Sequence, residues 1–167
     1  MTELGNCGNC NGEVTVDSDF CPHCGQIFEQ AGESPCDTHP ERKALAVCII
    51  CRKTLCEKCR TKVKRRSFCE QHQSIEVEED WAKIYQSSDV HEAEMVKAVL
   101  AGAGVKVEAQ NLSPASISTY FGEIALFRAF MRYPAKIFVP IPEFVRAMEV
   151  LQDWQSTFID AGKSSGE

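Results

Sequence analysis

The sequence predicts an α+β protein in which small metal-stabilised modules precede a two-layer α/β domain. All ten cysteines of the 167 residues lie within the first 69 positions, where they form regularly spaced pairs. After position 80, strand-like alternation and helical periodicity take over. The formal net charge changes at similar places, from −6 over residues 1–35 to +6 over residues 36–72 and −6 over residues 73–167. These three observations divide the chain into at least two kinds of domain.

Two changes in composition predict the domain boundaries. Residues 29–35 (EQAGESP) are polar and contain Gly and Pro, and residues 74–80 (SIEVEED) form an acidic run typical of a solvated linker. We therefore expect modules at 1–30 and 35–73, a linker at 74–80, an α/β domain at 81–158 and a disordered tail at 159–167.

The N-terminal residues and the hydropathy pattern bear on cellular location. No run of residues approaches the roughly 18 consecutive apolar residues that a membrane span needs. The first residues (MTELGNCGNC) lack the basic and apolar regions of a secretory signal. We therefore expect a cytoplasmic protein that does not associate with a membrane.

The strongest signal is a set of six residue pairs, each separated by two residues. They are Cys7/Cys10, Cys21/Cys24, Cys36/His39, Cys48/Cys51, Cys56/Cys59 and Cys69/His72. This spacing lets one tight turn, called a knuckle here, aim both side chains at one ion, and twelve such ligands complete three tetrahedral zinc sites. A disulfide framework, redox dithiols and an iron–sulfur cluster are the alternatives. Histidine at ligand spacing has no role in a disulfide, and six pairs together favour three Zn²⁺ ions.

The first predicted site consists of Cys7, Cys10, Cys21 and Cys24. The segment between its knuckles, GEVTVDSDF, predicts a short hairpin with alternating valines. Residues 5–28 resemble a short zinc ribbon, a fold that is specific as a metal site but not as a function. His23 lies inside the second knuckle, and we expect it to be a solvent-facing bystander.

Glycine in these knuckles predicts a left-handed backbone. Gly8, Gly12 and Gly25 lie within or just after the knuckles. Because glycine adopts positive φ without a steric penalty, we expect the backbone to fold under the metal at these three positions.

The remaining eight ligands predict two interleaved sites. Only four residues separate Cys51 from Cys56, so gathering the two central pairs around one ion would need a very tight reversal. Alternate pairing relieves this. It gives one site of Cys36, His39, Cys56 and Cys59, and another of Cys48, Cys51, Cys69 and His72.

This interleaved order, in the sequence CDTHPERKALAVCIICRKTLCEKC, resembles the B-box zinc finger, a cross-brace module. The resemblance implies a short strand at residues 44–47 before the second knuckle. Many animal B-boxes end in two histidines, whereas this chain ends in Cys69 and His72. A ubiquitin-ligase-like role is a minor alternative by analogy.

Small modules of this kind depend on their metal for folding. A piece of about 35 residues is below the size at which a hydrophobic core alone suffices. A structural zinc supplies roughly 10–16 kcal/mol of apparent binding free energy, which is also folding free energy. We therefore expect residues 1–72 to be unfolded, or nearly so, without metal. The thiolates also lower the net charge of the B-box from +6 to about +4.

A basic cluster at residues 60–66 precedes Cys69 and contains Arg60, Lys62, Lys64, Arg65 and Arg66. A phosphate backbone would bind such a cluster, but only Phe68 is close enough to stack on a base. The acidic whole chain would repel polyanions. Contact with a protein partner and a solvated surface are the other two interpretations.

The C-terminal third predicts strand–helix–strand followed by strand–helix. Strands are expected at residues 81–86, 105–109 and 136–140, with a helix beginning near Ser88 and ending at Gly104. The apolar positions of that helix are Ala93, Val96, Val99, Leu100 and Ala103. A second helix begins at Pro142, with a buried stripe of Phe144, Val145, Met148, Leu151 and Trp154. This order is a two-layer α/β plan.

The sequence of this region resembles a small bacterial family described as signal-transducing and of unknown function. The resemblance rests on HEAEMVKAVLAGAG in the first helix and on a strand that ends in Val-Pro. The resemblance covers residues 82–154 and implies an α/β plait related to ferredoxin-like and nitrogen-regulatory signalling folds. It assigns no catalytic residue. Residues 111–133 are rich in apolar side chains, and we expect a strand or short helix at 123–131. Core packing, a dimer face and a ligand pocket are the three interpretations of that segment.

No catalytic constellation is evident, because every thiol is assigned to metal and no nucleophile is paired with His91. The sequence thus favours a non-enzymatic zinc-binding adaptor or regulatory protein. Its zinc modules would bind a protein partner, and its plait domain would form a homodimer or sense a ligand. The alternative is a nucleic-acid-binding regulator that uses the ribbon and the basic cluster.

Overall fold

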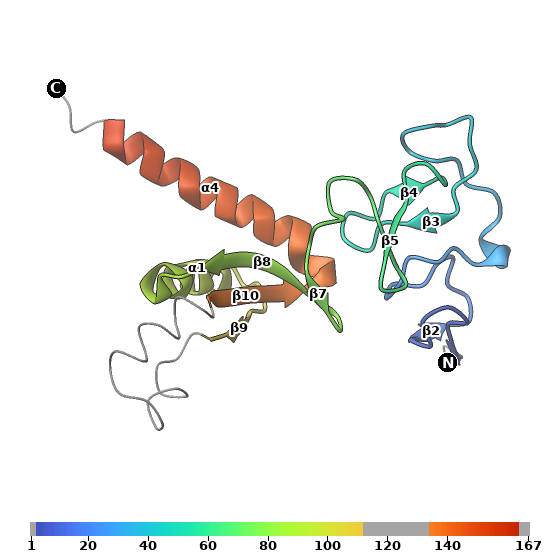
Figure 1. Ribbon diagram of the computed structural model, residues 1–167, viewed down its shortest axis with the longest axis horizontal. Coiled ribbons are helices and arrows are strands. Elements are labelled where there is room, and N and C mark those ends of the chain that lie inside the picture. Colours follow the sequence, from blue (N-terminus) through green and yellow to red (C-terminus); the bar gives the residue numbers. More distant parts are fainter. Residues whose placement is uncertain (1–2, 112–133, 164–167) are drawn as a thin grey trace. The chain divides into compact units, whose positions relative to one another are not determined.

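The chain forms two compact units, Met1–Ser74 and Ile75–Glu167. The structure is a computed structural model that describes residues 3–111 and 134–163 (Figure 1). The segment predicted at 123–131 lies outside the described residues. Among the described residues, no helix has the length and apolar character needed to cross a membrane.

The first unit is built from short strands that pair in antiparallel twos. β1 (Leu4–Asn6) pairs with β2 (Glu13–Thr15), β3 (Ala46–Val47) with β4 (Thr54–Leu55), and β5 (Thr61–Val63) with β6 (Arg66–Phe68). A short 3₁₀ helix, η1 (Glu29–Ala31), follows β2. Such short ladders cannot hold a fold by themselves, so the stability of this unit must come from elsewhere.

The hairpin predicted between the first two knuckles is wrong in its placement. β1 precedes Cys7 and pairs with β2 across the first knuckle, with Gly5 opposite Val14. The second knuckle is bracketed in the same way by an isolated bridge between Phe20 and Ile27. Each knuckle is therefore the tip of its own hairpin, because the reversal of direction at the metal turn brings its flanking residues side by side.

Cysteine makes up almost half of the buried hydrophobic core of the first unit. Among its described residues, seven of the fifteen buried hydrophobic side chains are cysteines of the candidate ligand sets: Cys7, Cys21, Cys24, Cys36, Cys48, Cys56 and Cys69. Cys10 is half-buried and packs against this core. The other eight are aliphatic or aromatic and include Ile49, Leu55 and Phe68.

The second unit contains a four-stranded antiparallel sheet in the order β7-β8-β10-β9. Its strands are β7 (Val77–Glu78), β8 (Trp81–Ser87), β9 (Glu108–Gln110) and β10 (Ala135–Pro140). β8 and β10 lie side by side in the centre (Figure 1). A register shift occurs between Ile137 and Phe138. The predicted strand at 105–109 begins later, because the Val105 N–H completes the end of the preceding helix by donating to the Leu100 carbonyl.

The acidic segment 74–80 differs from the predicted linker because it contributes an edge strand. β7 pairs with β8, and the Glu76 carboxylate lies 2.6 Å from Lys83 Nζ and 2.7 Å from Lys136 Nζ. The two lysines hold the pKa of Glu76 down to about 2 through hydrogen bonds and charge, led by Lys136. Part of the acidic run is therefore neutralised within the sheet.

Two helices in the described part of the second unit pack on the sheet. α1 (Val90–Gly102) begins at Asp89, whose side chain accepts hydrogen bonds from the backbone N–H groups of His91 and Glu92. The predicted stop at Gly104 is confirmed, with φ of +74° at that residue. A 3₁₀ turn, η2 (Ile141–Glu143), leads into α4 (Phe144–Lys163), which continues beyond the predicted domain end at 158 and so into the segment predicted as a tail.

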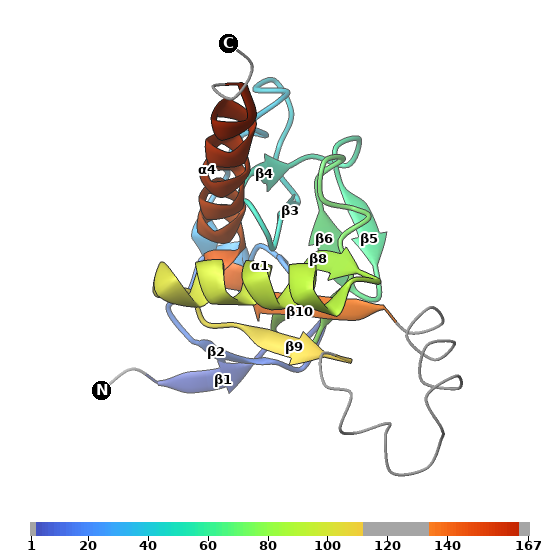
Figure 2. The same cartoon turned by 90° about the vertical axis from the view of Figure 1, so that its left-hand side faces the viewer.

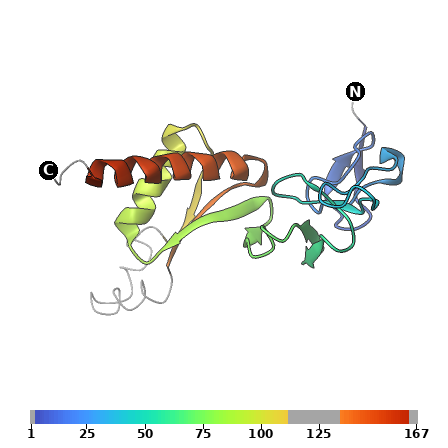
Figure 3. The same cartoon turned by 90° about the horizontal axis from the view of Figure 1, so that it is seen from above.

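α1 and α4 contact each other and both contact β8 and β10, so they cover one face of the sheet (Figure 3). The core between the layers is aliphatic and fully buried at positions such as Val96, Leu100, Ile137 and Val139. On α4 the buried side chains are Phe144, Ala147 and Leu151, whereas Val145, predicted in the stripe, is 42% exposed. Ala147 takes its place because it lies three residues after Phe144 on the same helical face.

Candidate metal centres

The structure brings the twelve predicted residues together in the three predicted sets, with all ligand atoms of a set within 4.8 Å of one another. We call them the four-cysteine site (Cys7, Cys10, Cys21, Cys24), the His39 site (Cys36, His39, Cys56, Cys59) and the His72 site (Cys48, Cys51, Cys69, His72). All ten cysteines are free of disulfides.

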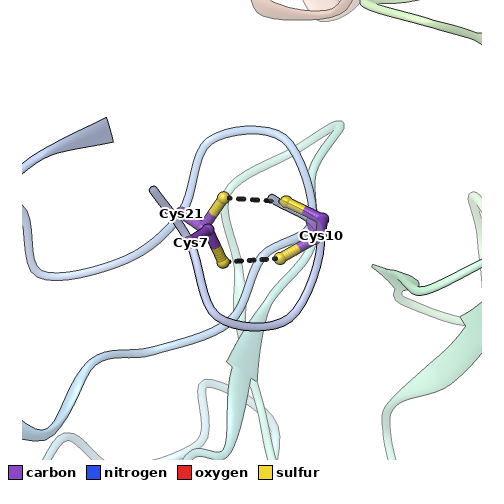
Figure 4. Close-up of side chains that lie close together, drawn as sticks. Cys7, Cys10 and Cys21 are labelled. Carbon is purple, nitrogen blue, oxygen red and sulfur yellow. Dashed lines mark hydrogen bonds between the residues drawn. The ribbon is translucent and has the colours of Figure 1, made fainter. Parts of the chain in front are cut away.

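The sulfurs of the four-cysteine site have the spacing of a tetrahedral metal centre. The Sγ atoms of Cys7 and Cys24 are 3.7 Å apart, and those of Cys10 and Cys21 are 3.6 Å apart. A tetrahedron with Zn–S bonds of about 2.3 Å has edges of ~3.8 Å. A disulfide would need about 2.05 Å. Figure 4 shows Cys7, Cys10 and Cys21 directing their sulfurs toward a common centre.

Each of the other two sites includes one histidine that faces its cysteines through Nδ1. His39 Nδ1 lies 3.1 Å from Cys59 Sγ and 3.7 Å from Cys56 Sγ. His72 Nδ1 lies 3.1 Å from Cys69 Sγ and 3.7 Å from Cys48 Sγ. In each site, one histidine nitrogen and three cysteine sulfurs can form a mixed S₃N coordination shell, which zinc accepts.

The sulfur spacing of these two sites matches that of the first. Cys36 and Cys59 Sγ are 3.8 Å apart, as are Cys51 and Cys69 Sγ. The first and third ligand pairs of residues 36–72 thus meet at one site, and the second and fourth pairs meet at the other. This is the interleaved arrangement that the short gap between Cys51 and Cys56 predicts.

Local backbone geometry forms the knuckles. The N–H of the residue after the second cysteine donates to the carbonyl of the first, as from Asn11 to Cys7, Gly25 to Cys21 and Arg52 to Cys48. At these three positions φ is +62°, +77° and +64°. The left-handed residue closes the turn beneath the metal. The expectation of positive φ is therefore correct for Gly25.

The same expectation is wrong for Gly8 and Gly12, neither of which has positive φ. Asn11 supplies the left-handed residue of the first knuckle instead. The sequence signal was present but misassigned, since asparagine tolerates this backbone conformation better than other residues with a side chain.

Backbone N–H groups also favour thiolate at the first cysteine of the four-cysteine site. Burial acts to raise the pKa of Cys7, but the N–H groups of Cys10 and Asn9 point at its sulfur and bring its pKa to about 7. Burial raises the pKa values of Cys21 and Cys24 above the ordinary value. The Cys7 thiol therefore ionises more readily than the neighbouring thiols of Cys21 and Cys24.

The His72 site has the same asymmetry. A hydrogen bond from Cys51 outweighs burial and lowers the pKa of Cys48 to about 4, whereas interaction with Cys48 and burial raise the pKa of Cys51. Neighbouring thiolates repel each other, so they cannot all ionise without a compensating cation. A divalent ion at the centre removes this conflict and would hold all the sulfurs deprotonated.

The remaining histidines of interest lie outside the metal sets. His23 Nε2 is 3.1 Å from the Glu13 carbonyl, and its ring packs so closely that a Cβ on Gly12 would lie 2.7 Å from it. It is therefore a packed side chain and not a ligand of the four-cysteine site. His91 lies in the first turn of α1 and is exposed.

The comparisons with known proteins concern the second unit. Residues 81–155, a little under half of the chain, match a family model with the description "Putative prokaryotic signal transducing protein". No curated protein and no solved structure matches the chain. The chain thus combines a segment that is similar to this family with a first unit whose three Cys/His clusters are positioned to hold metal ions.

Proposed function

We propose that the protein is a non-enzymatic zinc-binding adaptor or regulatory protein. The observation that carries the proposal is the closure of all three clusters. Each provides four protein ligands at tetrahedral spacing, which leaves no coordination position for water or substrate. Zinc in such sites is structural, so its role is to hold a surface in shape.

The finer assignments belong to this proposal. We assign the four-cysteine site to a zinc ribbon and the other two sites to a B-box-type cross-brace. A reducing, cytoplasmic location fits, because reduced thiols are needed to bind metal. Elemental analysis of the purified full chain should give three zinc ions per chain. Zinc absent from carefully prepared protein would remove the proposal.

A groove in the first unit supports binding of a protein partner. It has a volume of about 470 Å³ and includes His39 and Cys59 from one metal site and Cys69 from another. Lys53 and Lys58 are exposed on its wall.

The floor of this groove is apolar at Leu55, which is 2% exposed, and Glu70 is its one acidic lining residue. A peptide segment with carboxylates for the two lysines matches this chemistry. The net positive charge of residues 36–72 would speed its association.

A charge-reversal experiment tests the groove. The full chain with Lys53→Glu and Lys58→Glu should lose a specific protein partner that the unaltered chain captures from native lysate. The matched control is Lys62→Glu with Lys64→Glu, which reverses two exposed lysines outside the groove. Equal capture by both variants would contradict the assignment of the groove, and equal loss would indicate only a general charge effect.

Nucleic-acid binding is the second candidate function, and the β5–β6 hairpin favours it (Figure 2). Lys62 and Lys64 are exposed there, and the turn residues Lys64 and Arg65 have φ of +47° and +67°. A turn with two left-handed residues prefers Asn-Gly, so two basic residues in it carry strain. Arg65 is partly engaged, because its guanidinium donates to the Asn9 carbonyl at 3.4 Å.

A gel-shift series against salt tests this candidate with a duplex and a single-stranded probe. Binding through phosphate contacts should weaken steeply as salt rises, and Lys62→Glu with Lys64→Glu should abolish it. The groove variant then serves as the control. Absence of binding at low salt would exclude the candidate.

For the second unit we propose an α/β plait related to the ferredoxin-like fold, which dimerises or senses a ligand in signalling. The order and the antiparallel directions of β8, β10 and β9, together with α1 and α4, support this proposal. In a plait, the strand that follows the second helix lies at the edge beside the first strand, and here β7 occupies that edge position. Met95 and Val145 are exposed on α1 and α4, at 52% and 42%. Light scattering of the full chain tests dimerisation, and a monomer at all concentrations would exclude it.

A further inference from the structure

The four-cysteine site and the His72 site share a backbone junction. The Val47 N–H donates to the Gly25 carbonyl at 2.7 Å, and the Ser67 N–H donates to the Cys24 carbonyl at 2.9 Å. Gln26 and Ala46 form a bridge beside these bonds. The second knuckle of the four-cysteine site is therefore hydrogen-bonded to both β3 and β6.

Both of those strands lead directly into ligands of the His72 site. Cys48 follows Val47 at the end of β3, and Cys69 follows Phe68 at the end of β6. The Ile49 N–H also donates to the Ser67 carbonyl at 3.1 Å, which ties the two ligand-bearing segments to each other. Cys24 is itself a ligand, so only one or two peptide units separate ligands of the two sites from the shared hydrogen bonds.

The junction is buried and closely packed. Cys24, Ala46 and Cys48 are fully buried, and Ser67 is 3% exposed. A Cβ added to Gly25 would lie 2.0 Å from the Val47 carbonyl oxygen and 3.3 Å from the Ser67 Cβ. No side chain fits there without separating the two segments, and buried amides without partners are costly.

Side chains reinforce the junction on either side. The Arg52 guanidinium lies 5.5 Å from the Phe20 ring centroid, and Asn9 Nδ2 donates to the Arg65 carbonyl at 3.1 Å. Phe20 and Asn9 belong to the ribbon segment, whereas Arg52 and Arg65 belong to the cross-brace. The two predicted modules thus meet over a continuous set of contacts.

From this junction we propose that the four-cysteine site and the His72 site bind metal cooperatively, so that occupancy of one sets the affinity of the other. The inference rests on the proposed assignment of the clusters as metal sites. Emptying the four-cysteine site frees its second knuckle, which removes the acceptors of the Val47 and Ser67 amides and loosens the segments that hold Cys48 and Cys69. Coupling of this kind is reciprocal.

The test uses the full chain loaded with Cd²⁺, because cadmium NMR separates an S₄ site from S₃N sites by the number of bound sulfurs. Replacing two ligands of the four-cysteine site, Cys7→Ser with Cys10→Ser, should lower the Cd²⁺ affinity of the His72 site by about 5- to 150-fold. Replacing Cys48→Ser with Cys51→Ser should lower the affinity of the four-cysteine site by the same factor. Exchange of the Val47 and Ser67 amides should rise in the first variant.

Glycine substitutions separate coupling from ligand loss. Gly25→Ala keeps every ligand but disrupts the junction, and it should weaken both sites together. Gly8→Ala is the control, because a Cβ there meets nothing within 4 Å. Gly32→Ala controls for a left-handed backbone, with φ of +71° and open space around it. An unchanged His72 site in the Cys7→Ser, Cys10→Ser chain would overturn the proposal, whereas failure of the unaltered chain to bind Cd²⁺ would instead reject the metal assignment.

Discussion

The two units of this chain solve the problem of a folded core in different ways. In the first unit almost half of the buried hydrophobic side chains are cysteines, and its paired strands are only two or three residues long. In the second, aliphatic side chains such as Val96, Leu100 and Ile137 are buried between two helices and a four-stranded sheet. On the proposed metal assignment, the first unit is stabilised by bonds between its ligand atoms and metal, and the second unit by apolar area removed from water.

This difference implies that the two units unfold under different conditions. A core of ligands responds to metal supply, pH and oxidants, whereas an aliphatic core responds to heat and denaturant. A protein that combines them can lose one unit while retaining the other. Perturbations directed at one unit alone test that separation.

Removing metal should have the largest effect. A strong chelator under reducing conditions should unfold residues 1–74 and leave the second unit folded, because each site contributes roughly 10–16 kcal/mol of apparent binding free energy. Both tryptophans, Trp81 and Trp154, lie in the second unit, so their fluorescence should not change while amide signals of the first unit collapse. Parallel loss of both signals would contradict the separation.

Truncating the aliphatic core should destabilise the second unit and leave the first unit folded. Leu100→Ala should destabilise the second unit by about 2–5 kcal/mol, because Leu100 is fully buried between α1 and the sheet. Metal content should remain unchanged. Met95→Ala on the same helix is the control, since Met95 is 52% exposed and its loss should cost less than about 0.5 kcal/mol. Denaturant titration followed by tryptophan fluorescence measures both.

Removing the cap of α1 should cost less. Asp89 Oδ1 accepts from the His91 N–H at 2.8 Å and from the Glu92 N–H at 3.3 Å. Asp89→Ala should destabilise the second unit by about 1 kcal/mol, and Asp89→Ser should restore most of the loss because serine also caps helices. Identical unfolding curves for the two variants would show that the cap contributes little.

Acid should have the smallest effect on the second unit. The pKa of Glu76 is lowered from 4.5 to about 2 by Lys136 and Lys83, so its ionised form stabilises the folded state. That contribution is fully present above pH 4.5 and is lost as the pH falls toward 2. Because the pair is partly exposed, it is worth at most about 1 kcal/mol. Glu76→Gln should flatten this part of the stability profile, whereas Glu94→Gln, at an exposed position of α1, should leave it unchanged.

Much of the metal chemistry was predictable from spacing. A two-residue gap needs only one tight turn, so Cys7 and Cys10 are near neighbours whatever the rest of the chain does. The pairing of the later ligands followed from the short gap between Cys51 and Cys56. The strands β8 and β10 and the helices α1 and α4 of the second unit were also predictable, because apolar periodicity reports which face of an element is buried.

Other features had no local signal. β7 lies in an acidic run whose composition indicates a linker. Its place in the sheet is supported by Lys83 and Lys136, which contact Glu76 just before the strand, and by Gln110, which donates a hydrogen bond to Glu78. The groove lysines Lys53 and Lys58 were visible as basic residues, but their position beside Leu55 depends on how the cross-brace folds.

The sequence by itself determined the three sets of cysteine and histidine side chains and the buried face of α1, because both are set by interactions over a few residues. Only the tertiary structure decided that the second knuckle is hydrogen-bonded to β3 and β6. That junction consists of backbone N–H and carbonyl groups, which nearly every residue type carries, so the residue pattern does not predict it. The one local sign is the absence of a side chain at Gly25.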